Sequence, residues 1–268
     1  MDMIKINNIT CGYHNFPVLK DISLGIREGE FLGIIGPNGS GKSTLLKSTS
    51  RSLKPFSGTI LYKDKDIYTI PHEKLAQSFA FVSQDTVFNF SFAVWEIVLM
   101  GRIPYLKRMQ KEGSHDIEVA KEAMRLTDTL KLSDREVGKL SAGERQMMII
   151  ARALTQEPKV LFLDEPTAHL DIGHQVQILN LIKTLNQNKN ITVVIVLHDL
   201  NLASEYCERL ALLNNGSLFC LGKPEEVLTY QNIEKVYKTL VLVNKSPVSG
   251  NPHVLLLRKP SGDTSALS

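Results

Sequence analysis

The sequence has 268 residues, a formal net charge of +3 and an isoelectric point near 8.6. This length suits one substantial domain or two small ones and leaves no room for a fused membrane domain. Lysine and arginine are spread along the chain instead of forming a run, which gives no support to nucleic-acid binding. The longest apolar runs, such as 193–197, fall far short of the roughly 20 residues of a membrane helix.

The N-terminal residues and the cysteines bear on the cellular location expected for the protein. The first ten residues lack the basic and then apolar pattern of a secretion signal. Cys11, Cys207 and Cys220 are isolated, without the spacing of a metal site or a disulfide framework. We therefore expect a cytosolic protein whose thiols fill space.

Short apolar runs alternate with longer amphipathic stretches along the chain. This alternation predicts an α/β fold with a parallel sheet covered by helices. Two of the runs, 160–163 and 191–197, show no polar alternation, as expected of central strands buried on both faces. The expected strands are 31–35, 79–83, 160–163 and 191–197, and the expected helices are 42–50, 117–130, 144–154, 173–187 and 199–206.

The domain organisation follows from where the strand signal stops. Between Ser91 and Leu140 helix-like patterning takes over, which indicates a mainly helical insertion. After Tyr230, the tail is interrupted by Pro247, Gly250, Pro252 and Pro260, and we expect a small appendage packed on the body. The predicted division is a first catalytic part at 1–84, a helical subdomain at 85–150, a second catalytic part at 151–229 and an appendage at 230–268.

A phosphate-binding loop follows the first expected strand, and a helix follows the loop. Glycines let backbone N–H groups turn inward around a phosphate, and the helix points its positive end at the same anion. Lys42 is expected to reach the β- and γ-phosphates, and the Ser43 hydroxyl is expected to hold Mg²⁺. A glycine-rich turn with a chance lysine is the alternative, but it does not explain the flanking strand and helix. The nucleotide-binding candidates are Gly36, Pro37, Asn38, Gly39, Ser40, Gly41, Lys42, Ser43 and Thr44.

Two adjacent carboxylates end the apolar run 160–163. In an open α/β sheet, ligands bind at this end of the strands. Asp164 is expected to hold Mg²⁺ directly or through its water shell, and Glu165 to orient and deprotonate the attacking water. A solvated pair at a strand end would be the default interpretation if no phosphate loop were present.

The peptide Leu140-Ser141-Ala142-Gly143-Glu144 opens an expected helix, and Ser141 with Glu144 also forms an ordinary capping box. Here nearly the whole chain resembles the ATP-binding cassette ATPases. Their signature peptide presents a helix N-terminus to the γ-phosphate bound on a partner subunit. The chain departs from the common form at Ala142, which adds a methyl group near the phosphate, and at Glu144, which adds a negative charge.

Four other positions match the family in the expected order. The resemblance implies that Tyr13 stacks on adenine, that Gln84 touches Mg²⁺ and the water, and that His198 contacts the γ-phosphate. Asp171, in the loop 168–171, would signal between two ATP sites. Taken alone, Tyr13 could be a turn aromatic, Gln84 a surface amide and His198 an incidental strand-end histidine.

The resemblance also implies an architecture and an assembly. The fold would be a P-loop NTPase, with a RecA-like parallel sheet core, an N-terminal antiparallel β part and a helical signature subdomain. Two copies would form a head-to-tail homodimer that sandwiches two ATP molecules between phosphate loop and signature. The cofactors would be ATP and Mg²⁺, with Glu165 as the catalytic base assisted by His198 and Gln84.

Three segments resemble one subgroup, the importers of metal chelates such as iron siderophores, haem and cobalamin. They are 91–105 with its Gly-Arg-x-Pro-aromatic element, 171–175, and the tail 244–253. Pro104 could instead merely break a helix, and the tail could be a plain surface hairpin. The implied partners are two multi-helix permease subunits and, indirectly, an extracytoplasmic binding protein, with the chain peripheral at the cytoplasmic face of the membrane.

The segment 88–105, with Gln84, is expected to line a groove that grips the permease, and charge reversal at Arg102 is expected to weaken that association. The alternatives left open are the ATPase half of an exporter and a soluble ATPase acting on nucleic acid or ribosomes. A small-molecule kinase would leave the signature peptide and His198 unexplained. The cargo stays open among iron chelate, haem, corrinoid and oxyanion.

Overall fold

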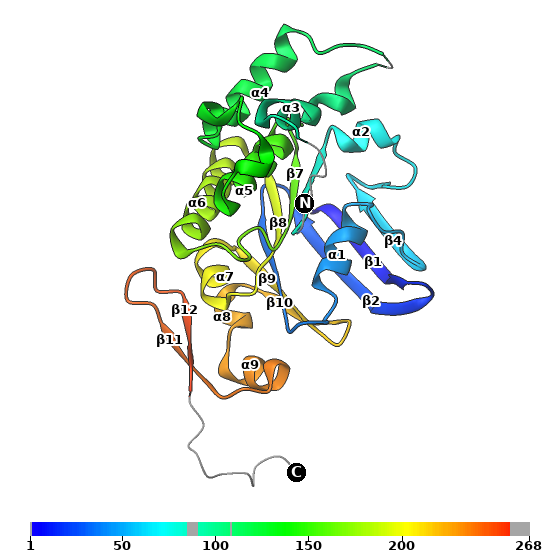
Figure 1. Cartoon of the computed structure of the whole chain (residues 1–268). Coiled ribbons are helices and arrows are strands. Elements are labelled where there is room, and N and C mark those ends of the chain that lie inside the picture. The colour runs from blue at the N-terminus through cyan, green and yellow to red at the C-terminus, as the bar shows by residue number, and fades with distance from the viewer. Residues whose placement is uncertain (1, 85–90, 108, 258–268) are drawn as a thin grey trace.

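A six-stranded sheet forms the centre of the computed structural model, which describes residues 2–84, 91–107 and 109–257 (Figure 1). Its order is β10-β9-β3-β8-β7-β6. All neighbouring strands are parallel except β10, which is antiparallel to β9. The expected parallel sheet is therefore confirmed. The strands are β3 (Phe31–Ile35), β6 (Phe79–Val82), β7 (Val160–Asp164), β8 (Thr192–Val196), β9 (Arg209–Asn214) and β10 (Ser217–Gly222).

Both faces of this sheet are buried. Along β7, Val160 and Phe162 belong to one apolar cluster, whereas Leu161 and Leu163 belong to the other. All four side chains are fully buried, which explains why the run has no polar residue. Helices α5 (Ala142–Leu154), α6 (Ile172–Lys189) and α7 (Leu200–Tyr206) cover one face, as Figure 1 shows.

The other face packs against α1 (Lys42–Thr49) and a second, antiparallel sheet of order β2-β1-β4-β5. Residue-pair register between β1 and β2 shifts at several bulges, which lets these two long strands twist. The strands are β1 (Asp2–Tyr13), β2 (Phe16–Arg27), β4 (Ser57–Tyr62) and β5 (Lys65–Asp66), and the short helix α2 (His72–Ala76) leads to β6.

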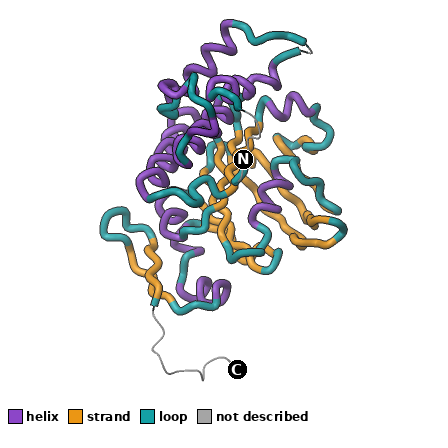
Figure 2. Tube along the Cα trace, in the orientation of Figure 1, coloured by secondary structure: helices purple, strands orange, loops and turns teal. Residues whose placement is uncertain are grey.

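The upper part of the molecule is helical (Figure 2). The expected helix 117–130 runs instead from Ser114 to Leu126 as α4. It ends early because the hydroxyls of Thr127 and Thr129 donate hydrogen bonds to carbonyls of its last turn. The other elements here are α3 (Val94–Leu99) and the 3₁₀ segments η1 (Met100–Tyr105), η2 (Leu130–Leu132) and η3 (Val137–Lys139).

The C-terminal part is more regular than the proline and glycine residues suggested. It contains α8 (Pro224–Val227), α9 (Tyr230–Tyr237) and a hairpin of β11 (Val241–Lys245) and β12 (Pro252–Leu256). Pro252 opens β12 instead of interrupting it, and Gly250 supplies a left-handed turn residue. Within the described residues, no helix has the length and apolar character needed to cross a bilayer.

Arg102 is an interior residue, so the expectation that it meets a permease is wrong. Its side chain is 2% exposed. The guanidinium donates hydrogen bonds to Asp116 (2.9 Å), to the Thr155 carbonyl (3.0 Å) and to Glu157 (2.7 Å). It also lies 3.8 Å from the centre of the Tyr105 ring. Arg102 therefore ties η1 to α4 and to the end of α5.

Arg102→Met should lower the free energy of unfolding by about 3 kcal/mol, because Asp116 keeps its charge without its buried partner. Urea unfolding measures the change. Arg125→Met is the matched control, since that exposed guanidinium pairs with Glu118 and Glu122 at the surface. Equal losses in both variants would contradict a structural role for Arg102.

Candidate nucleotide-binding site

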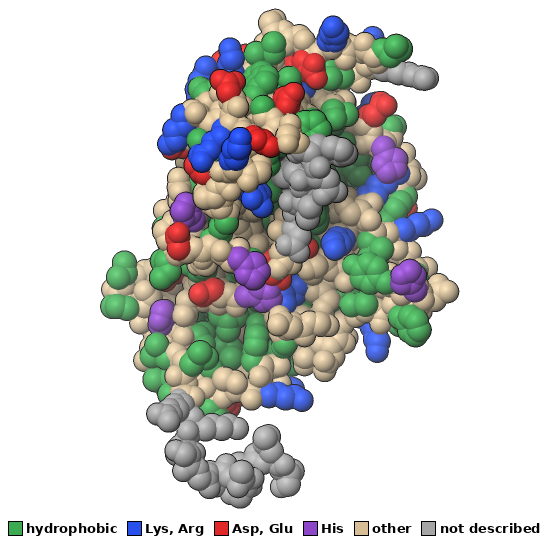
Figure 3. Space-filling model, viewed as in Figure 1, with side chains coloured by type: hydrophobic (Ala, Val, Ile, Leu, Met, Phe, Trp, Pro, Cys, Tyr) green, Lys and Arg blue, Asp and Glu red, His purple; other side chains and the backbone are tan. Residues whose placement is uncertain are grey.

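The candidate site lies at one edge of the parallel sheet. Residues 36–41 follow β3, Asp164 ends β7, and His198 lies just beyond β8. These three strands are neighbours, and they run in the same direction. Their carboxyl ends therefore bring the three segments together. Figure 3 shows histidine, acidic and basic side chains gathered in the middle of the face in view.

The phosphate loop requires glycine for steric reasons at two positions. Gly36 has φ = 148°, and a Cβ there would lie 2.4 Å from the Leu213 carbonyl oxygen. Gly41 has φ = 100°, and a Cβ there would lie 2.5 Å from Leu19. Helix α1 starts directly after Gly41 and has no side-chain cap. Its first-turn N–H groups are therefore suited to an anion.

Lys42 is buried, and it is bonded to its own loop. Its Nζ donates hydrogen bonds to the carbonyl oxygens of Gly36 (3.0 Å) and Pro37 (3.1 Å). Burial lowers the pKa of Lys42, although the nearby carboxylates of Glu165 and Asp164 act in the opposite direction. The ammonium group thus lies inside the loop that the sequence assigns to phosphates.

Ser43 and Asp164 are in direct contact. The Ser43 hydroxyl donates a 2.8 Å hydrogen bond to Asp164 Oδ1. Asp164 is 3% exposed, and burial raises its pKa, partly offset by this hydrogen bond. One carboxylate beside one hydroxyl is a set of ligands that suits Mg²⁺, which binds through one or two carboxylates together with phosphate oxygens.

Glu165 and His198 form the second contact of the site. Glu165 Oε1 lies 2.5 Å from His198 Nε2, and Glu165 is much less exposed than His198. The Glu165 backbone has φ = 51°, which is uncommon for a residue other than glycine. The structure therefore brings together Lys42, Ser43, Asp164, Glu165 and His198, as the sequence suggested.

Gln84 and Tyr13 lie farther out. Gln84 is exposed just beyond β6, next to β7 in the sheet, and within the described residues it makes no hydrogen bond to Ser43 or Asp164. Tyr13 is 42% exposed at the end of β1, where it faces Phe16 across a tight turn. Phe16 is 76% exposed and was missed in the sequence, although it lies only three residues after Tyr13.

The signature peptide begins α5 through a complete capping box. The Glu144 N–H donates to Ser141 Oγ (3.2 Å), and the Ser141 N–H donates to Glu144 Oε2 (2.8 Å). These bonds lower the pKa of Glu144, and Arg135 lies 3.3 Å from the same carboxylate. The Glu144 carboxylate, which the sequence suggested would lie near a nucleotide, is thus bonded to the start of its own helix and paired with Arg135.

His174 connects the signature peptide to Asp171, a link that the sequence did not reveal. Asp171 caps α6, accepting from the His174 N–H (2.9 Å), and its other oxygen lies 2.8 Å from His174 Nδ1. The backbone bond is the main cause of a lowered pKa for Asp171. The imidazole also lies against Gly143, where an added Cβ would be 2.2 Å from His174 Cδ2.

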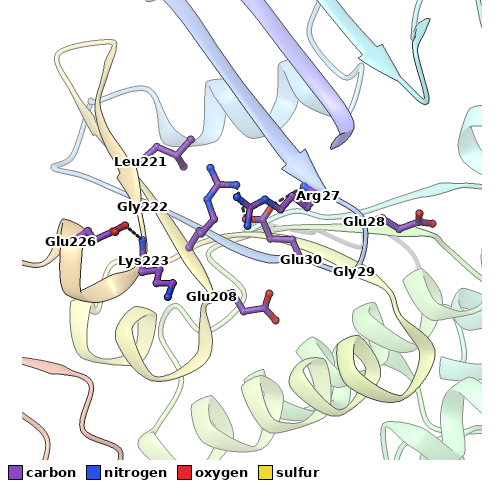
Figure 4. A pocket seen from close by; sticks show the side chains of 10 residues that line it. Arg27, Glu28, Gly29, Glu30, Glu208, Leu221, Gly222, Lys223 and Glu226 are labelled. Carbon is purple, nitrogen blue, oxygen red and sulfur yellow. Dashed lines mark hydrogen bonds and ion pairs between the residues drawn. The ribbon is translucent and has the colours of Figure 1, made fainter. Parts of the chain in front are cut away.

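A separate cavity of about 690 Å³ lies at the opposite edge of the sheet (Figure 4). It is lined by the turn between β2 and β3, the start of β9 and the end of β10. Its buried Glu30 accepts hydrogen bonds from Arg209 (2.9 Å) and from the Arg27 N–H (2.7 Å). None of the candidate nucleotide-binding residues lines it, and its buried charges are mutually paired.

The comparisons with known proteins identify the family. The family model described as ABC transporter matches residues 19–168, which is more than half of the chain. The chain therefore belongs to the ABC transporter family, and it is an ATPase of the ABC type. This confirms the resemblance and the P-loop fold.

Two curated relatives are similar over nearly their whole length. The chain is 35% identical to the probable siderophore transport system ATP-binding protein YusV of Bacillus subtilis, covering 94% of this chain and 92% of that protein. It is also 35% identical to the ferric enterobactin transport ATP-binding protein FepC of Escherichia coli, covering 97% and 96%.

Two solved structures share the fold. One is described as an inward-facing ABC transporter of metal-chelate type, with a TM-score of 0.84, 30% identity, and coverage of 96% of this chain and 98% of that chain. The other is the dimeric, post-hydrolysis ATP-binding cassette MJ0796 bound to ADP and Pi. Its TM-score is 0.71 at 30% identity, covering 82% and 98%.

Gly143→Ala should lower stability by about 1–3 kcal/mol, since the new methyl group forces the His174 ring away and breaks its contact with Asp171. Thermal unfolding measures the loss. His174→Ala in the same chain should recover most of it, because the obstructing ring is gone. Additive losses in the double variant would show that Gly143 and His174 do not conflict.

Proposed function

We propose that this chain is the ATP-hydrolysing subunit of an importer that takes up a metal chelate through a separate permease. The chelate would be of the iron-siderophore, haem or cobalamin type. The observation that carries this proposal is the meeting of two pairs, Ser43 with Asp164 and Glu165 with His198, at the edge of the sheet beside the phosphate loop. The near full-length similarity to two siderophore-transport subunits supports the choice of cargo.

The phosphates of ATP would lie in the loop 36–41, against the uncapped start of α1. Lys42 now donates to two loop carbonyls, and it would exchange these for β- and γ-phosphate oxygens. Because the ammonium group is already desolvated in the loop, little reorganisation is needed when the nucleotide binds. The adenine ring would stack on Tyr13, with the exposed ring of Phe16 close by.

Ser43, Asp164 and Gln84 would hold Mg²⁺. When bound, this ion neutralises charge that develops on the phosphate oxygens. Asp164 is kept beside Ser43 by their hydrogen bond, so the two oxygen ligands are already adjacent. Gln84 would have to approach from the exposed end of β6, which would make its position sensitive to movement of the helical subdomain.

Glu165 would act as the base. Its carboxylate would orient the attacking water and accept a proton from it. His198 holds this carboxylate at 2.5 Å and is itself half exposed, so it can turn toward the γ-phosphate. Both residues stand on loops that directly follow buried strands, and this fixes their distance to the phosphate loop.

Head-to-tail dimerisation would complete each site. Ser141, Ala142, Gly143, Glu144 and Asp171 would face the nucleotide bound by the other copy. His174 joins these two segments within one chain, so both would reach the partner as a unit. The dimeric form of a similar cassette supports this assembly. The proposed assembly also includes two permease subunits and a binding protein, with this chain at the cytoplasmic face of the membrane. The division of the chain into four parts remains a prediction.

Complementation between two defective chains tests the head-to-tail arrangement. Lys42→Ala removes the phosphate contact of one chain, and Ser141→Arg blocks its signature peptide. Each chain alone should be inactive as an ATPase. A mixture should recover up to about a quarter of the parent rate, since half of the dimers are mixed and each mixed dimer holds one complete site.

The control mixture combines Lys42→Ala with Asp164→Asn. Both changes damage the same half of the composite site, so no mixed dimer holds a complete one. Phosphate release is the measurement in both mixtures. Absence of recovery with Ser141→Arg, or equal recovery in the control, would rule out sharing of sites between copies.

Co-purification with a multi-helix permease encoded by an adjacent gene tests the import function. ATP hydrolysis by the complex should rise when a binding protein loaded with one class of chelate is added, among ferric siderophore, haem and cobalamin. A Glu165→Gln complex is the control: it should assemble and bind ATP but turn over about 10²–10⁴-fold more slowly. No association with the permease, or no response to any chelate, would contradict metal-chelate import.

A further inference from the structure

The C-terminal hairpin is bonded to α7, the helix that follows His198. Asn201, in the first turn of α7, makes two hydrogen bonds to one residue of β12. Its Nδ2 donates to the Val254 carbonyl (3.2 Å), and the Val254 N–H donates to its Oδ1 (2.7 Å). The side-chain amide thus occupies the place that a neighbouring strand would take, only three residues after His198.

Further bonds continue along the same helix. The buried Ser204 hydroxyl donates to the Pro252 carbonyl at 2.7 Å. At the end of α7, Glu205 accepts from the Ser249 hydroxyl (2.6 Å) and from the Asn251 amide (3.5 Å). The hairpin therefore holds α7 along almost its full length of seven residues.

The hairpin packs into the larger apolar core of the protein, which fixes its position. Val241 and Val254 are buried, together with Ile233 and Val236 of α9. All four belong to the apolar cluster that contains Leu197 and one face of strands β7 and β8. Figure 1 shows the hairpin and α9 beside α7 and α8. A helix of two turns has little stability of its own, so its position depends on such packing.

The same C-terminal segment reaches the phosphate loop. Tyr237, the last residue of α9, is partly buried near the Gly36 backbone. Burial raises the pKa of Tyr237 to about 12, against an opposing effect of the Gly36 backbone. Gly36 is the first residue of the loop that follows β3. One segment thus lies near the start of the loop and is bonded to the helix behind His198.

We propose that residues 230–257 are a positioning element for ATP hydrolysis, which sets the position of His198 relative to the phosphate loop by holding α7. This inference rests on the proposed ATPase site. Misplacement of a catalytic group by about 1 Å can cost as much as 10²-fold in rate. The hairpin would therefore act on turnover, through His198, and leave ATP affinity unchanged.

Asn201→Ala tests the proposal because it removes both bonds to Val254. We expect kcat to fall about 10- to 100-fold, with KM for ATP within about twofold of the parent. Asn244→Ala is the matched control: it removes an exposed asparagine from the same hairpin and should leave kcat unchanged. Ser204→Ala should also lower kcat, by a smaller factor. It replaces Asn201→Ala in the test if that variant does not fold.

A double-mutant cycle with His198→Ala separates positioning from general loosening of the structure. If Asn201 acts through His198, Asn201→Ala should slow hydrolysis no further in the His198→Ala chain. Release of labelled phosphate over hours quantifies the slow variants. The His198 imidazole NMR signal gives a readout without hydrolysis, and it should shift in Asn201→Ala and Ser204→Ala but not in Asn244→Ala.

An unchanged kcat and an unmoved His198 signal in both α7 variants would overturn the proposal. So would an equal loss of activity with and without His198. Failure of the proposed ATPase function would give a different result. The parent chain would not hydrolyse ATP, or the Glu165→Gln chain would hydrolyse it as fast as the parent, with or without the substitutions in α7.

Discussion

Burial of the central strands on both faces is the constraint on which the rest of the structure depends. Along β7, the side chains of residues 160–163 alternate between two separate apolar clusters, so none of these four positions suits a charge. Carboxylates are possible only where the strand leaves the core, at Asp164 and Glu165. Even there Asp164 is almost fully buried, and the Ser43 hydroxyl compensates part of the cost of its charge.

The sequence predicted those parts of the fold that depend on local pattern. Continuous apolar runs located β3, β6, β7 and β8 almost to the residue, because strands buried on both faces leave no polar positions. The antiparallel sheet was expected only through family resemblance. In β1 the burial pattern breaks at its bulges, so no regular alternation marks it. The end of α4 was missed because it depends on two threonine hydroxyls.

The candidate site was predictable in its residues but not in its contacts. Motif spacing located Lys42, Asp164, Glu165 and His198, whereas the partners of each came from strands far apart in sequence. Arg102 was misjudged for the same reason. An arginine is usually exposed, and its burial here needs Asp116 and Glu157, 14 and 55 residues away.

The starts of four helices differ in how open they are to an anion. Helices α6 and α7 begin at Asp171 and Asp199, whose carboxylates place a negative charge at the helix start. Asp171 accepts from one first-turn N–H group and Asp199 from two. Helix α1 has no such cap, which leaves its start open to phosphate within the same chain. Helix α5 begins with a hydroxyl cap, since Ser141 accepts from the Glu144 N–H. Within the described residues the N–H groups of Ala142 and Gly143 have no acceptor, which leaves this helix start able to receive an anion.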